Sequence, residues 1–189
     1  MNRRLATAAA AFCLLAATIT AAAPASATAG TPAGAPFDTH SDDFGPVSVH
    51  GAAGTVLTTT FTGFEGDAVR IEVDAHADVN TDPRTTRGHF HVTHVHTDGR
   101  LVADFSGDIT CLGVGGREAI ATGVVTSGEA PWFPGRTPVG AKVALTVQGN
   151  GRHAGRVGWV WGMFGAPVSD CQGTVAFLPT TSGGFTVRG

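Results

Sequence analysis

The sequence predicts an all-β fold: a single antiparallel β-barrel, or alternatively a β-sandwich, of about eight to ten strands with one disulfide. Three observations support this prediction. Turn-forming glycines recur about every eight to twelve positions, a spacing typical of sandwiches and barrels. Between these turns, apolar and polar residues alternate with a period of two, as they do in half-buried strands. After residue 30, no stretch sustains the period of a helix.

The first 27 residues have the layout of a secretory signal peptide. Two arginines lie near the start, an alanine-rich apolar stretch follows, and small residues occupy positions 25–27. We expect cleavage after Ala27, with Ala29 as the second choice. The apolar stretch falls short of the roughly 20 strongly apolar residues that a membrane span needs. The sequence therefore predicts a secreted, extracellular protein with no transmembrane anchor in the mature chain.

Residues 28–36 consist of small residues and proline, and we expect them to form a flexible leader. Removal of the signal leaves 162 of the 189 residues, which is a typical length for one domain. We therefore expect a single all-β domain over residues 37–189.

The charge balance argues against several partners. The chain has 12 basic and 15 acidic residues, and loss of the signal with its two arginines leaves a formal charge of −5. Such a chain has neither the basic face of a nucleic-acid-binding protein nor a polybasic membrane patch. The sequence predicts no nucleic-acid partner and leaves a cell-envelope or small-molecule partner open.

Two cysteines, Cys111 and Cys171, remain once the signal with Cys13 is removed. In an oxidising compartment, two cysteines in one small domain most simply form a disulfide. In the chain-entropy model, closing so long a loop stabilises the fold by about 4 kcal/mol. The alternative is a pair of buried free thiols.

Three segments show the alternation of a strand most clearly. The residues predicted to share one face are, in the first segment, Val69, Ile71, Val73 and Ala75; in the second, Leu101, Ala103, Phe105, Ile109 and Cys111; and in the third, Val143, Leu145 and Val147. Each pattern predicts a strand with one buried and one wet face. Glycines inside predicted strands favour a barrel over a sandwich, because such glycines often mark the bends of a small barrel. They are Gly107, Gly123, Gly158 and Gly162.

Residues 88–96 are rich in histidine and read Gly-His-Phe-His-Val-Thr-His-Val-His. Residues two apart on a strand project to the same face, so His89 pairs with His91 and His94 pairs with His96. The two pairs differ in parity, and a regular strand therefore places them on opposite faces.

A bulge near Thr93 would instead bring all four histidines together. Imidazole pairs at this spacing bind zinc or copper well, and His76, His50 or an aspartate would supply a third ligand. The alternative is a solvated edge strand on which the histidines are merely polar.

A second conspicuous pattern places Trp159 and Trp161 on one face with Val157 and Met163. Such a stripe is most often part of a barrel core, where large rings bury much apolar area. The alternative is an apolar pocket at the mouth of the barrel that binds a small ligand.

Catalytic motifs are missing from the sequence. It has no Gly-x-Ser-x-Gly nucleophile elbow. The acid pair Asp42-Asp43 falls in a predicted loop, where such pairs are usually solvated surface. The glycine-rich residues 113–116 are typical of a hairpin turn and not of a phosphate-binding loop. The sequence therefore favours a protein that is not an enzyme.

Residues 105–125 carry a hairpin motif of glycines, small apolar residues and one cysteine. Its positions are Gly107, Ile109, Cys111, Leu112, Val114, Gly116, Ala119, Gly123, Val124 and Val125. This hairpin resembles that of small exported actinobacterial proteins, some labelled repetin, and Cys171 matches a later cysteine of that group. A looser similarity extends to β modules of bacterial surface proteins. The resemblance runs in order over residues 53–189 and implies an exported β domain without an established activity. The dense histidines of residues 89–96 depart from the group's pattern.

Three functional hypotheses follow. The first is a secreted, non-enzymatic β-barrel that acts as a binding or envelope-associated module. The second is a zinc- or copper-binding protein or metalloenzyme that uses His89, His91, His94 and His96. The third is a carrier of a small apolar ligand that uses Trp159 and Trp161.

Overall fold

The computed structural model describes residues 45–189, except residue 59 and residues 150–154. The predicted signal peptide and leader lie outside these residues. The elements are β1 (Val47–Val56), β2 (Ala68–Ala77), β3 (Thr86–Val95), β4 (Leu101–Gly115), β5 (Glu118–Glu129), β6 (Lys142–Gln148), β7 (Arg156–Trp161), the 3-10 turn η1 (Gly162–Phe164), β8 (Leu178–Pro179) and β9 (Ser182–Arg188). In the described part of the chain, no helix is long and apolar enough to cross a membrane.

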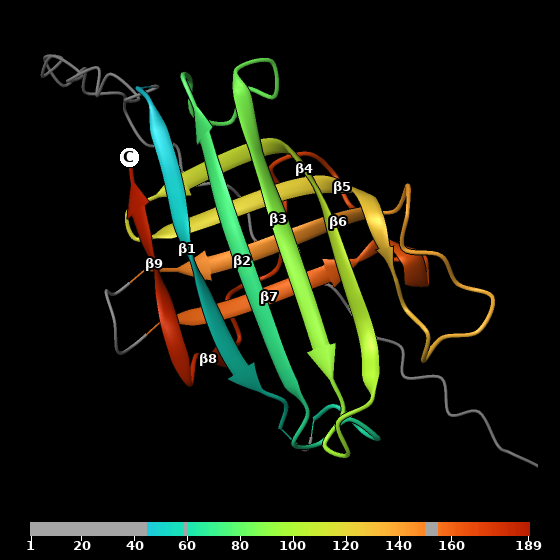
Figure 1. Cartoon of the computed structure of the whole chain (residues 1–189). Coiled ribbons are helices and arrows are strands. Elements are labelled where there is room, and N and C mark those ends of the chain that lie inside the picture. The colour runs from blue at the N-terminus through green and yellow to red at the C-terminus, as the bar shows by residue number, and fades with distance from the viewer. Residues whose placement is uncertain (1–44, 59, 150–154) are drawn as a thin grey trace, which may run out of the picture. The chain divides into compact units, whose positions relative to one another are not determined.

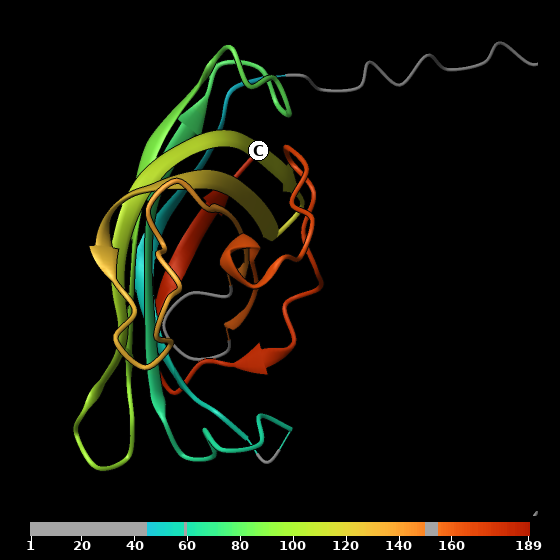
Figure 2. The same cartoon turned by 90° about the vertical axis from the view of Figure 1, so that its right-hand side faces the viewer.

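All nine strands belong to one antiparallel sheet in the order β8-β7-β6-β5-β4-β3-β2-β1-β9. In Figure 1, β1, β2 and β3 lie in front and cross β6 and β7 behind them. Figure 2 shows the long strands β4 and β5 curving between the layer of β1, β2 and β3 and the layer of β6 and β7. The predicted all-β antiparallel fold of eight to ten strands with one disulfide is confirmed, and its form is a single curled sheet, a half-barrel.

The two ends of this sheet are joined by a connection of two residues. β8 pairs with β7, and β9 pairs with β1, so the chain passes between the sheet ends at Thr180 and Thr181. The Thr180 N–H donates to the carbonyl oxygen of Gly155 at 2.9 Å, and the Thr181 N–H donates to that of Gly54 at 2.8 Å. One acceptor directly precedes β7 and the other lies in β1, so the two bonds hold the opposite sides of the curled sheet together at this point.

The bend of β4 and β5 depends on two glycines that the sequence places inside strands. A side chain at Gly107 would begin 2.6 Å from the ring of Phe90, and one at Gly123 would begin 3.0 Å from the same ring. The register also shifts between Ser106 and Gly107, as it does at a β-bulge. Phe90 therefore fills the concave side of the bend, in space that only glycines leave free.

A second register shift corrects the predicted face of Cys111. Alternation placed Cys111 on the same face as Ile109, but the pairing with β5 shifts between these two residues. Ile109 is buried in the concave core, whereas Cys111 is paired with Thr122 and points to the convex side. The extra residue of the bulge reverses the parity of the strand beyond it.

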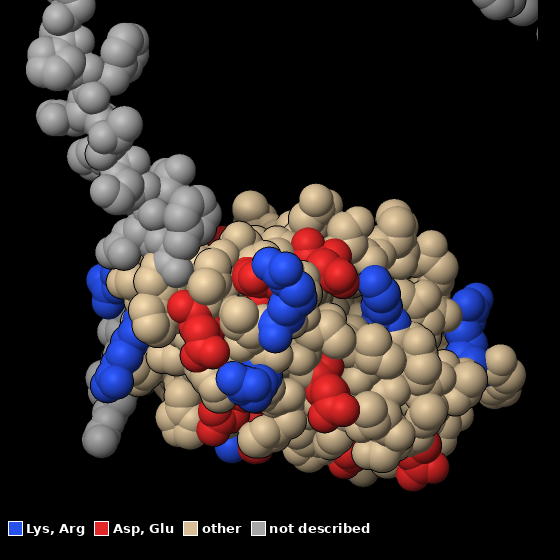
Figure 3. All heavy atoms as spheres, turned by 90° about the horizontal axis from the view of Figure 1, so that it is seen from above, with Lys and Arg blue, Asp and Glu red and all other residues tan. Residues whose placement is uncertain are grey.

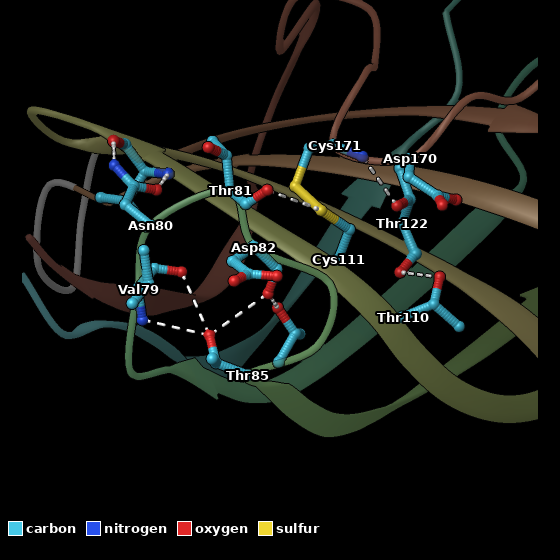
Figure 4. Close-up of a disulfide and its surroundings, with 12 residues drawn as sticks. Val79, Asn80, Thr81, Asp82, Thr85, Thr110, Cys111, Thr122, Asp170 and Cys171 are labelled. Atoms are coloured by element: carbon cyan, nitrogen blue, oxygen red, sulfur yellow. Dashed lines mark hydrogen bonds between the residues drawn. A yellow bond between two sulfur atoms is a disulfide. The ribbon is translucent and has the colours of Figure 1, made fainter. Parts of the chain in front are cut away.

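The convex side is covered at this point by residues 165–177, which we call the outer strap. The disulfide between Cys111 and Cys171 fixes the strap to β4, with 5.1 Å between the two Cα atoms. The Cys171 N–H donates to the hydroxyl of Thr122 at 3.1 Å (Figure 4). Further along, the Thr146 hydroxyl donates to the carbonyl oxygen of Thr174 at 2.6 Å.

The strap explains why β6 departs from its prediction. Its pattern predicted one wet face, yet Ala144 and Thr146 are as buried as the core residues Val143 and Leu145. The concave side of β6 faces the core, and the strap covers the convex side. A segment far along the chain thus decides the burial of this strand.

The β2–β3 loop adds to the same cover (Figure 4). The side-chain amide of Asn80 donates to the carbonyl oxygen of Val114 at 2.8 Å, and its oxygen accepts from the Val114 N–H at 2.9 Å. The Thr81 N–H donates to the carbonyl oxygen of Leu112 at 3.0 Å. The pairing of β3 with β4 ends at Asp108, so these bonds satisfy backbone groups of Leu112 and Val114 that have no partner in β3.

The hydrophobic core lies on the concave face of the sheet. The predicted alternation of β2 is confirmed, since Val69, Ile71, Val73 and Ala75 are all buried. The largest fully buried side chains are Phe90, Phe105, Ile71, Leu112 and Leu145. Outside the core, acidic and basic side chains lie intermixed on the surface seen in Figure 3.

Candidate functional site

A cavity of about 340 Å³ opens on the concave side, at the end of the sheet where β1 and β3 finish and β2 and β4 begin. Its lining residues are Leu57, Phe61, Phe64, Val69, Val92, His94, Ala103, Phe105, Phe133, Trp159, Trp161, Met163 and Phe164. Seven of these are phenylalanine or tryptophan, from a chain with 11 phenylalanines and three tryptophans. Phe164 is 42% exposed, so the cavity reaches the surface.

Strand β7 supplies the two tryptophans that the sequence singled out. Trp159 is paired with Leu145 and Trp161 with Val143, and both partners belong to the concave core. Cross-strand partners share a face, so both indoles lie on the concave side. Their rings stack with centroids 5.7 Å apart, and Phe105 of β4 meets Trp161 edge-on at 5.4 Å.

The β1–β2 loop brings two phenylalanines to the cavity. The Leu57 N–H donates to the carbonyl oxygen of Asp67 at 2.9 Å and closes the loop. Inside it, Phe61 donates its N–H to Thr58, and Phe64 donates its N–H to Phe61, which makes two successive turns. The ring of Phe61 lies 6.1 Å from that of Trp159, as a side wall of the cavity.

Two other segments complete the mouth of the cavity. Phe133, from the β5–β6 loop, meets Phe164 of η1 edge-on with centroids 4.8 Å apart. Arg136 donates from Nη1 to the carbonyl oxygen of Met163 at 2.9 Å, and its guanidinium lies 5.6 Å above the ring of Phe164. The loop and η1 are therefore tied together where the cavity opens.

Among the described residues that line the cavity, His94 alone has a titratable side chain, and it belongs to a buried hydrogen-bonded group. Its Nε2 lies 2.8 Å from Oδ2 of Asp67, a carboxyl with no exposed surface. The other oxygen, Oδ1, lies 2.7 Å from Nδ1 of His96 and accepts from the Thr97 N–H at 3.1 Å. Three groups therefore converge on Asp67, as a buried carboxyl requires.

The protonation state of His94 follows from this setting. Burial lowers the pKa of His94 below its ordinary value of 6.5, although the hydrogen bond to Asp67 opposes the shift. His94 is therefore neutral at pH 7. An ionised carboxylate can only accept, so the ring proton of His94 is on Nε2 and its Nδ1 carries a lone pair.

The second predicted pair, His89 and His91, lies on the convex face. Their neighbours Phe90 and Val92 are buried on the concave side, and the parity of a strand sends alternate residues outward. His91 Nε2 lies 2.8 Å from Oδ1 of Asp104, across the β3–β4 pair.

The four predicted metal ligands thus do not meet. The register shift in β3 falls between His94 and Val95, and it leaves His89 and His91 on the face opposite to His94. Within residues 45–189, as far as the structure describes them, no group of three or more histidine, cysteine or acidic side chains is arranged to hold a metal ion. Zinc or copper binding by either pair stays a prediction.

Asp67 is the site residue that sequence reasoning missed. It lies next to Gly66 in a segment interpreted as a turn, where an acidic residue is usually solvated. The phenylalanines of the loops were missed as well. Their signal was present, because Phe61 and Phe64 stand among turn-forming residues, and Phe133 lies between Trp132 and Pro134. Aromatic residues in such loops indicate a surface that the loops bury together.

Comparison with known proteins gives no relative: no protein-family model, no curated protein and no solved structure matches the chain.

Proposed function

We propose that this protein is an exported binding protein, without enzymatic activity, whose cavity carries a small apolar molecule. The observation that supports this most is the 340 Å³ cavity lined by Trp159, Trp161 and five phenylalanines. Ligand sites are typically concave spaces of about 300–1,000 Å³, with apolar and aromatic walls and a few convergent polar groups. Trp159 and Trp161 were the residues for which the sequence offered such a pocket as the alternative to a barrel core.

The partial exposure of the aromatic walls supports the same reading. Phe61, Phe64, Phe133, Trp159 and Trp161 are only half-buried, and they gather around one opening. Apolar surface left in contact with water is unfavourable by about 25 cal/mol per Å², and a ligand that covers it recovers this free energy. Contiguous exposed apolar surface of this kind commonly marks a binding site.

The polar content of the cavity favours binding over catalysis. Among its described lining residues, His94 alone has a titratable side chain. Acid–base catalysis usually needs a second group that donates a proton or stabilises the developing charge. One acceptor in an apolar cavity is instead what a binding site uses to orient its ligand.

Export is part of the proposal. The signal layout of residues 1–27 predicts it, and the Cys111–Cys171 disulfide supports it because disulfides persist in oxidising compartments. The resemblance to exported actinobacterial proteins points the same way. A carrier outside the cytoplasm would hold an apolar molecule that is poorly soluble in water.

Displacement of a neutral fluorescent dye by two-ring aromatic compounds tests the proposed function. We expect the purified protein to bind N-phenyl-1-naphthylamine and the Trp161→Ala variant to bind it at least about tenfold more weakly, because an aromatic wall is lost. Trp132→Ala is the matched control, since Trp132 packs beside the site against Phe64 but does not line the cavity. Absence of dye binding, or equal weakening by both variants, would contradict the proposal.

A further inference from the structure

The chemistry of the cavity also indicates which apolar molecules it selects. We infer, on the basis of the proposed function, that the ligand is a compact aromatic molecule with one hydroxyl, which donates its hydrogen bond to Nδ1 of His94.

His94 offers the ligand a single acceptor atom. Its Nε2 is engaged by Asp67, and among the described residues Nδ1 has no hydrogen-bond partner. The ring is held in place on a second side by Phe64, whose centroid lies 5.4 Å away. A histidine fixed in this way presents its free nitrogen to a ligand with little loss of conformational entropy.

Asp67 makes that free nitrogen an acceptor and not a donor. Its carboxylate receives the backbone N–H of Thr97 and lies within hydrogen-bond distance of both His94 and His96. A carboxylate only accepts hydrogen bonds, so both histidines donate an N–H to it, and the proton of neutral His94 lies on Nε2. A ligand hydroxyl satisfies the lone pair of Nδ1, whereas an ether oxygen or a carboxylate at the same place meets another acceptor.

The walls favour a flat, uncharged ring system. The stacked pair of Trp159 and Trp161 forms one wall, and Phe61 and Phe105 stand beside it. Aromatic walls also attract quaternary ammonium ions. Asp67, the carboxyl that holds His94, does not line the space and is already engaged by three donors, so a cation gains little there.

The volume sets the size of the ligand. A dry cavity of about 150 Å³ holds benzene. A space of about 340 Å³ therefore has room for two to three aromatic rings, from a substituted naphthalene to N-phenyl-1-naphthylamine. A long acyl chain would extend beyond it.

Two ligands that differ only in the hydroxyl hydrogen test the inference: 2-naphthol and 2-methoxynaphthalene. We measure each affinity by competition with the bound dye at pH 7.5. The protein should bind 2-naphthol about tenfold more tightly, the difference that one net favourable hydrogen bond makes. Phenyltrimethylammonium should bind more weakly than 2-naphthol.

Asp67→Asn is the decisive variant, because it is isosteric and reverses the tautomer. An asparagine amide N–H facing His94 Nε2 would move the ring proton to Nδ1 and remove the acceptor. We expect the preference for 2-naphthol to disappear in Asp67→Asn and to persist in His89→Gln, a substitution on the convex face. Imidazole ¹⁵N NMR spectra of the unsubstituted protein give an independent readout of the Nε2–H tautomer.

The outcomes separate the two proposals. Equal affinities for both naphthalenes in the unsubstituted protein, or an Nδ1–H tautomer of His94, would overturn this inference and leave the apolar carrier standing. Tighter binding of phenyltrimethylammonium would overturn it in favour of a cation site. If no naphthalene compound and no dye binds, the proposed function fails and this inference fails with it.

Discussion

At the scale of single residues, the group formed by Asp67, His94 and His96 is the most informative feature. A carboxyl without exposed surface is stable only when its oxygens are satisfied, and two histidines and a backbone N–H do this. The sequence paired His94 with His96 and left open whether a bulge near Thr93 brings this pair to the face of His89 and His91; the structure has the two pairs on opposite faces. The sequence did not predict the partner of His94 and His96, because the link between Asp67 and His94 crosses a strand pairing that no local pattern reveals.

The pH dependence of stability tests this group. Burial lowers the pKa of His94 in the folded protein below its ordinary value of 6.5, against the opposing hydrogen bond to Asp67. As the pH falls below 6.5, the unfolded chain takes up a proton at His94 before the folded chain does, so the free energy of unfolding decreases. Well above pH 6.5, His94 is neutral in both the folded and the unfolded protein and does not change the free energy of unfolding with pH.

We therefore expect the free energy of unfolding to fall more steeply between pH 7.5 and 5.5 in the unsubstituted protein than in His94→Gln. Urea denaturation at both pH values measures the difference. The same slope in both proteins would show that His94 is not held neutral by burial.

At the scale of elements, period-two alternation predicted the faces of β2 and most of β4 correctly. It failed where β4 bulges, since the parity of Cys111 depends on an extra residue that only the pairing with β5 reveals. It failed also for β6, whose convex face is covered by the distant outer strap. Both failures have one cause: long-range packing can override a local pattern.

The bend at Gly107 gives a prediction for β4. A methyl group in Gly107→Ala would collide with the ring of Phe90 and with the carbonyl oxygen of Val124. We expect a loss of about 2–3 kcal/mol in the free energy of unfolding, the usual range for overpacking a tight core. Gly115→Ala is the control, because open space surrounds that position and the change should stay within about 0.5 kcal/mol. Similar urea midpoints for both variants would contradict the role given to Gly107.

The disulfide gives a prediction for the outer strap. Cys111 and Cys171 are 60 residues apart, and the chain-entropy model gives such a cross-link about 4 kcal/mol of stabilisation. We expect the double variant Cys111→Ser, Cys171→Ser to lose about 3–4 kcal/mol in urea denaturation. Dye binding should persist in the folded variant, because the disulfide joins the strap to the convex side of β4. The strap residue that packs against the cavity residues Trp159 and Phe61 is Phe177, which lies next to β8 at the other end of the strap. Loss of binding without loss of stability would mean that the strap shapes the cavity.

At the scale of the whole molecule, composition and alternation were enough to predict an all-β domain with one disulfide. The curl of the sheet followed in part from interior glycines such as Gly107 and Gly123. The composition of the cavity could not be predicted from the sequence, because its walls come from four strands, two loops and η1, which meet only in the folded chain. Trp159 and Trp161 suggested a cavity as an alternative to a barrel core, since two large rings on one face of a strand need a partner for their exposed surface.

The central claim is that the cavity itself binds the ligand, and filling it is the most direct test. Ala103 is buried in the cavity wall, so Ala103→Phe places a ring in the space that the ligand would occupy. The matched control is Ala52→Phe on β1, beside Glu72 at the convex face. We measure the affinity for N-phenyl-1-naphthylamine together with the melting temperature of each protein. We expect Ala103→Phe to keep or raise the melting temperature and to lose dye binding, while Ala52→Phe binds the dye as the unsubstituted protein does. Undiminished binding by a folded Ala103→Phe protein would contradict the central claim.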